Sequence, residues 1–159
     1  MQPAPLPWFI VLLVSVPQTF LIIIIGFQLF NQYISYSRVL ILSLIIGILT
    51  IFARELPLPF GAHTVILTVS LTLLANVVTG TNLWHCFISI LSGVLILGVL
   101  EGVLLPIFLK VTETTTDDLV LKPWINLVCF LPLGIIAAIF YILAKKRNYV
   151  IFDLDLDRD

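Results

Sequence analysis

Five long apolar segments restrict what this chain can fold into. Each approaches the roughly 20 apolar residues that a helix needs to cross the hydrocarbon core of a bilayer. In lipid a backbone must satisfy its own N–H and C=O groups, and a helix does so within a single segment. We therefore expect an all-α integral membrane bundle of five transmembrane helices, over residues of about 8–30, 36–52, 60–78, 83–109 and 124–144.

The composition agrees with a membrane protein. Of the 159 residues, 60% are hydrophobic and only 11% are charged, whereas a soluble domain carries about 25% charged residues. A net charge of −1 provides no broad basic surface for nucleic acid. The first residues contain no Lys or Arg, so the first apolar segment is interpreted as a retained span rather than a signal peptide. We expect one transmembrane domain, 1–147, and a short acidic tail, 148–159.

The positions of the Lys and Arg residues predict an orientation. A cluster of three basic residues, 145–147, directly follows the last apolar segment, and positive residues favour the cytoplasmic side. With this cluster inside, an odd number of spans puts the N-terminus outside and the C-terminus in the cytoplasm. Five of the eight Lys and Arg residues then lie inside. We expect a multi-pass protein of the cytoplasmic membrane, with the lipid bilayer as its first partner.

The segment between the second and third spans, "ARELPLPFGAHTVI", concentrates unusual residues. Pro57 and Pro59 cannot continue a helix. Arg54 stands at a helix C-terminus, where the helix dipole favours a cation, and His63 falls in the first turn of the third helix. One interpretation is a stiff interfacial turn with purely structural side chains. The other is that Arg54 and His63 contribute to a binding site.

The second interpretation depends on Glu101, which lies within the fourth span in "LGVLEGVLLPIF". A charge deep in a membrane helix costs roughly 2.5–3.5 kcal/mol on insertion scales, so Glu101 must be paired, protonated or facing a wet cavity. It is about 12 Å from Leu109 along the helix, in the same half of the membrane as Arg54 and His63. We therefore predict a ligand-binding site formed by Arg54, His63 and Glu101. The alternative is a neutral, structural Glu101 bonded to a carbonyl.

Gln18 is a second polar residue inside a span, and it follows Pro17 near the middle of the first apolar segment. Its amide either bonds a carbonyl that the proline frees or lines a polar path. The sequence shows no His and Cys clusters with metal-ligand spacing, no Gly-rich phosphate loop and no Ser–His–Asp set. We therefore expect no metal, no cofactor and no enzymatic activity.

Two pairs of small residues stand four positions apart, Gly98 with Gly102 and Gly134 with Ala138. Such pairs let two membrane helices approach closely. They predict either packing within the bundle or a homo-oligomer face.

Four stretches, "GFQLF", "FARELPLPFGAHTVI", "LEGVLLPIF" and "KKRNYVIF", resemble in order and spacing the multi-span membrane region of Firmicute-type bacterial GHKL sensor histidine kinases. In that family the region is an input module, and a dimerisation and ATP-binding part follows the last helix. Here the basic cluster is followed by the short segment 148–159. The resemblance thus implies a stand-alone relative of the sensor module that acts through a partner such as a histidine kinase.

The leading expectation is a non-enzymatic membrane sensor or signalling accessory protein that detects a ligand near the outer leaflet. A subunit of a transporter or of an ion or proton channel is a second possibility, in which Glu101 and Gln18 line the route. A structural membrane assembly protein, in which every polar residue is structural, is the third.

Overall fold

The computed structural model describes residues 7–55, 61–115, 122 and 124–153, apart from the side chains of residues 54 and 55. Within these residues there are helices and no strands. The helices are α1 (Trp8–Leu29), α2 (Tyr36–Glu55), α3 (Ala62–Thr79), α4 (Leu83–Val111) and α6 (Trp124–Lys146). All five are long and apolar enough to cross a membrane, which confirms, for the described residues, the expected all-α class and the expected number of such helices.

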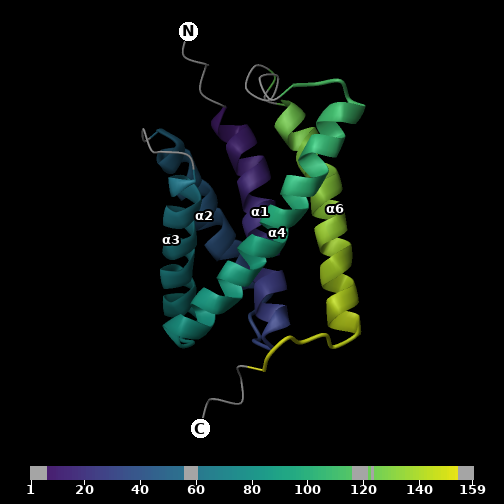
Figure 1. Cartoon of the computed structure of the whole chain (residues 1–159). Coiled ribbons are helices and arrows are strands. Elements are labelled where there is room, and N and C mark those ends of the chain that lie inside the picture. The colour runs from purple at the N-terminus through teal and green to yellow at the C-terminus, as the bar shows by residue number, and fades with distance from the viewer. Residues whose placement is uncertain (1–6, 56–60, 116–121, 123, 154–159) are drawn as a thin grey trace.

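The helices run alternately up and down (Figure 1). We call the end of the bundle where α1 and α6 begin the upper end, and the end where α2 and α4 begin the lower end. Helix α1 lies at the centre and contacts α2, α4 and α6, while α3 packs on α2 and α4. Helix α4 crosses α1 obliquely in Figure 1. The expected orientation in the membrane stays a prediction.

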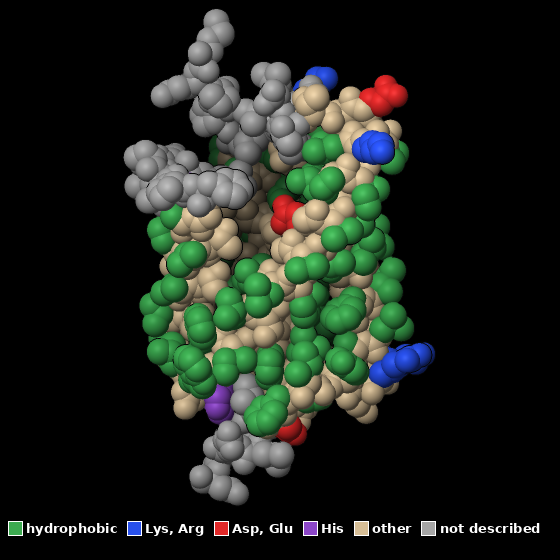
Figure 2. Space-filling model, viewed as in Figure 1, with side chains coloured by type: hydrophobic (Ala, Val, Ile, Leu, Met, Phe, Trp, Pro, Cys, Tyr) green, Lys and Arg blue, Asp and Glu red, His purple; other side chains and the backbone are tan. Residues whose placement is uncertain are grey.

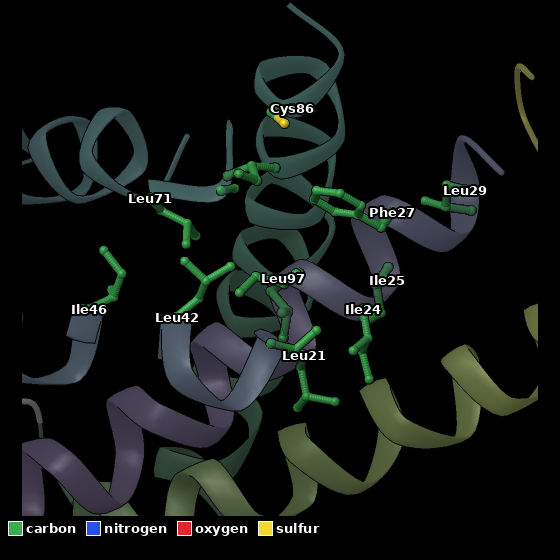
Figure 3. Packing of buried hydrophobic residues seen from close by; sticks show 14 of the residues in the cluster. Leu21, Ile24, Ile25, Phe27, Leu29, Leu42, Ile46, Leu71, Cys86 and Leu97 are labelled. Carbon is green, nitrogen blue, oxygen red and sulfur yellow. The ribbon is translucent and has the colours of Figure 1, made fainter. Parts of the chain in front are cut away.

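Helix α1 supplies more of the described buried hydrophobic residues than any other helix, because it is largely apolar and lies between three neighbours. Ile25, Phe27 and Leu29 are each only 1% exposed. They share one hydrophobic cluster with Leu42 of α2 and Leu97 of α4 (Figure 3). A helix that is hydrophobic all round is buried, either by protein or by lipid. The central position of α1 means that a shift of this helix must disturb three neighbours.

The crossing of α1 and α4 depends on two glycines. A Cβ atom on Gly26 would lie 2.1 Å from the carbonyl oxygen of Ser89, and one on Gly93 would lie 2.2 Å from the carbonyl oxygen of Ile22. Side chains cannot occupy such positions, so the two backbones approach as closely as they do because both residues are glycine.

The two pairs of small residues singled out from the sequence differ in their surroundings. A Cβ atom on Gly98 or Gly102 would meet no atom within 4 Å, so in the described part of the chain these glycines pack no helix. A homo-oligomer face there stays a prediction. A Cβ atom on Gly134 would meet only the ring of Phe130 in the same helix, at 3.4 Å. Ala138 packs against the core cluster.

The turn between α3 and α4 makes these helices antiparallel neighbours. Gly80 has a φ of 68° and closes α3, and its N–H donates to the carbonyl of Asn76 at 2.9 Å. Such a left-handed residue after a helix is usually glycine. The side chain of Asn82 then accepts a hydrogen bond from the N–H of Trp84 at 3.1 Å and caps α4.

Candidate functional site

Glu101 and Gln18, the intramembrane acid and amide singled out from the sequence, contact each other. The Gln18 Nε2 atom donates to the Glu101 Oε2 atom at 3.4 Å, near the long limit for a hydrogen bond. Gln18 lies about 15 Å along α1 from Trp8, and Glu101 lies about 15 Å along α4 from Val111. The contact therefore lies far from the helix ends, although Glu101 itself is exposed at the surface of the bundle and Gln18 is partly buried. This contact gives the carboxylate the polar partner that an intramembrane acid requires.

The glycine crossing explains why these side chains meet. Gln18, Ile22 and Gly26 are spaced four residues apart and share one face of α1. Gly93 and Glu101 are eight residues apart and share one face of α4. Gly93 lies against Ile22. Towards the upper end, Gln18 follows about one turn from Ile22 on α1 and Glu101 about two turns from Gly93 on α4, and there the two side chains meet. The hydrogen bond that the structure shows for Gln18 goes to this carboxylate, not to a carbonyl freed by Pro17.

Where side chains are described, the structure shows no hydrogen bond between Glu101 and the two partners predicted for it, Arg54 at the end of α2 and His63 at the start of α3. The side chain of Arg54 lies outside the described residues, so an Arg54–Glu101 pair stays a prediction. His63 is partly buried in the first turn of α3. No hydrogen bond among the described residues joins it to Glu101. The ligand site of Arg54, His63 and Glu101 accordingly stays a prediction.

The segment that follows α6 is bound to the end of α1. The backbone N–H of Ile151 donates to the carbonyl oxygen of Leu29 at 2.8 Å. The side-chain amide of Asn31 donates to the Asp153 carboxylate at 2.9 Å. Asn31 has a φ of 53°, a left-handed conformation that Asn tolerates better than most residues. The turn that ends α1 is thus also the docking point for residues 151–153.

A polar cluster joins α2 to α6 at the lower end. The hydroxyls of Tyr36 and Tyr141 are 2.9 Å apart, and the Lys145 ammonium donates to the Tyr36 hydroxyl at 2.8 Å. The same ammonium lies 5.4 Å from the centre of the Tyr36 ring and 5.8 Å from that of Tyr141. Of these three residues, only Lys145 contributes to a prediction from the sequence, as part of the basic cluster that predicts the orientation. Tyr141 and Lys145 are four residues apart, about one helical turn, and this spacing in the sequence indicates that they share one face of α6.

An apolar groove of about 450 Å³ lies beside this cluster, between α1, α2 and α6. Pro17 and Phe20 of α1, Leu40 of α2, and Gly134 and Ala138 of α6 are among its lining residues. The small residues predicted to pack α6 against another helix thus form one wall of an open groove.

The surface agrees with a bundle embedded in lipid. Hydrophobic side chains cover the middle of the face in Figure 2, and the Lys and Arg side chains visible there lie near its two ends. Within the described residues, no group of three or more His, Cys, Asp or Glu side chains could hold a metal ion.

No protein-family model, curated protein or solved structure matches this chain.

Proposed function

We propose that this chain is a non-enzymatic membrane sensor or signalling accessory protein in which α1 carries the signal. One observation supports this proposal above the others. Helix α1 contacts Glu101 through Gln18 near the middle of its length, and its lower end holds the segment after α6 through Leu29 and Asn31. A single central helix thus connects the intramembrane carboxylate to residues 151–153.

The proposed mechanism needs two arrangements of α1 and α4. A ligand shifts such an equilibrium only by the difference between its affinities for the two arrangements. We propose that a small apolar or peptide ligand binds near the outer leaflet, at the upper end, through Arg54, His63 and Glu101. If binding draws Glu101 away from Gln18, α1 is released at its middle. The docking of Ile151 and Asp153 then changes at the lower end, where a partner reads it.

The proposal places the upper end outside the cell and the lower end in the cytoplasm of a bacterium. The exposed Lys145 and Lys146 at the end of α6 support this orientation through the preference of positive residues for the cytoplasmic side. A histidine kinase is the proposed class of partner.

Crosslinking in native membranes followed by purification and mass spectrometry tests the proposal. We expect a histidine kinase or a response regulator to be crosslinked to the wild-type chain, and Glu101→Gln to change the amount captured. Gly98→Ala serves as the matched control on the same helix, because its Cβ would meet nothing within 4 Å. Recovery of a transport ATPase or a permease would contradict the sensor function.

A subunit of a transporter or proton channel is the second candidate, and the Gln18–Glu101 contact favours it as well. A carboxylate in a membrane helix is a common component of a proton relay. Proton flux into vesicles that contain the purified chain tests this function directly. Flux that disappears in Glu101→Gln and persists in Gly98→Ala would establish it in place of the sensor.

A further inference from the structure

We propose that the groove between α1, α2 and α6, together with the cluster of Tyr36, Tyr141 and Lys145, binds one anionic phospholipid. Its acyl chain lies in the groove and its phosphate lies against Lys145. This inference does not depend on the proposed sensor function.

The groove and the cluster are continuous. The Phe20 ring, which lines the groove, stacks on the Tyr36 ring with centroids 6.5 Å apart and planes 17° apart. On α6, Gly134, Ala138, Tyr141 and Lys145 follow one another at spacings of three and four residues, so they share one face of the helix. The apolar wall therefore leads along α6 directly to the ammonium group.

The dimensions suit a lipid of one leaflet. Gly134 lies about 16 Å from Lys145 along α6, and one leaflet of hydrocarbon is about 15 Å thick. The groove volume of about 450 Å³ is within the usual range for small-molecule sites. A headgroup at Lys145 thus places its acyl chain at the depth of the groove.

The cluster has hydrogen-bond donors available for an anion. An ammonium has three N–H donors, and Lys145 uses one of them on the Tyr36 hydroxyl. The two tyrosine hydroxyls carry two hydrogens and share one bond. Lys145 also interacts with the Tyr141 side chain by hydrogen bonding. Among the described residues, at least one ammonium hydrogen and one hydroxyl hydrogen therefore remain for another acceptor. An ammonium donor and a hydroxyl donor beside a positive charge at the membrane boundary match a phosphate group.

The surroundings favour an anionic over a zwitterionic lipid. Lys145 is followed by Lys146 and Arg147, all three exposed. Basic residues at the end of a transmembrane helix attract anionic lipid headgroups. Lys146 and Arg147 supply general attraction, whereas Lys145 is held in a defined geometry by Tyr36.

The preference for an anionic headgroup is tested with the full chain in detergent micelles. The micelles contain equal amounts of phosphatidylglycerol and phosphatidylcholine with identical acyl chains. Native mass spectrometry counts the lipids that remain bound. We expect phosphatidylglycerol to be retained over phosphatidylcholine, and Lys145→Gln to weaken its binding about fivefold. Lys146→Gln, which removes an equal charge one position away, should change binding much less. Equal losses in the two variants would overturn the proposal, as would equal retention of the two lipids.

The groove is tested with Gly134→Leu, which fills it, against Gly98→Leu, which adds the same side chain to open space on α4. We expect Gly134→Leu to lose the bound lipid and Gly98→Leu to keep it, with circular dichroism showing equal helix content. Ala138→Leu provides a second block if Gly134→Leu does not fold. Retention of phosphatidylglycerol by a folded, blocked variant would overturn the proposal. Recovery of a polyprenyl phosphate instead of a phospholipid from native membranes would overturn the assigned occupant.

Discussion

Gly26 of α1 faces the backbone of Ser89 of α4 so closely that a Cβ atom on Gly26 would lie 2.1 Å from the Ser89 carbonyl oxygen. Gly93 makes the reciprocal contact with the carbonyl of Ile22, at 2.2 Å. Lipid tails are as apolar as leucine, so membrane helices associate through such close packing rather than through the hydrophobic effect. The contact between Gln18 and Glu101 follows from this crossing.

Gly26→Ala and Gly93→Ala should each destabilise the bundle. The added methyl group must push α1 and α4 apart, and overpacking of this kind costs about 1–3 kcal/mol. Unfolding in detergent, followed by circular dichroism, measures the change. Gly98→Ala is the control, since its methyl group meets open space and alanine favours a helix more than glycine. Equal stabilities of Gly26→Ala and Gly98→Ala would show that the crossing is not as close as described.

Gln18 and Glu101 should be energetically coupled. Interhelical hydrogen bonds in membranes average about 0.6 kcal/mol and reach about 1.7 kcal/mol. A double-mutant cycle with Gln18→Leu, Glu101→Leu and the double variant measures the coupling in the free energy of unfolding. We expect the double variant to lose less stability than the two single variants added together. Strictly additive losses would mean that the two side chains do not interact.

Asn31 should hold the segment after α6 in place. Asn31→Gly preserves the left-handed backbone but removes the donor to Asp153, and Asn31→Asp puts two carboxylates side by side. We expect faster hydrogen exchange at the Ile151 amide in both variants, with the larger effect in Asn31→Asp. Glu113→Gly, at another left-handed position, is the control and should leave the Ile151 amide unchanged. Unaltered exchange in Asn31→Asp would rule out this role of Asn31.

The Asn82 side chain should stabilise the start of α4. It accepts a hydrogen bond from the N–H of Trp84, and replacing such a cap with alanine costs about 1 kcal/mol. Asn82→Ala should therefore lower the free energy of unfolding, while Asn82→Asp keeps an acceptor and should lose much less. Thermal unfolding of the three proteins in one detergent gives the comparison. A similar loss in both variants would indicate that the cap does not contribute.

The sequence predicts the helices well because the length of an apolar segment reflects the thickness of the bilayer. The predicted ends of the helices differ from those in the structure where charged residues border an apolar segment. Helix α2 continues beyond residue 52 to Glu55, and α4 continues beyond Leu109 to Val111. Charged residues within one turn of a span end remain compatible with the helix because long side chains reach the interface. Gln18 and Glu101 are also recognisable from sequence, since polar residues are rare in such segments.

Which residues contact one another between helices is much harder to predict from the sequence. Gly98 and Gly102 fit a small-residue pattern, whereas Gly26 and Gly93, which lie in different helices, make the close crossing. The docking of Asp153 on Asn31 and the cluster of Tyr36 with Lys145 also join distant parts of the chain. In a soluble protein an apolar stripe marks the face that is buried. Here lipid and protein are equally apolar. The sequence therefore predicts the five long apolar helices of the described residues, but the faces by which they meet follow from the three-dimensional packing.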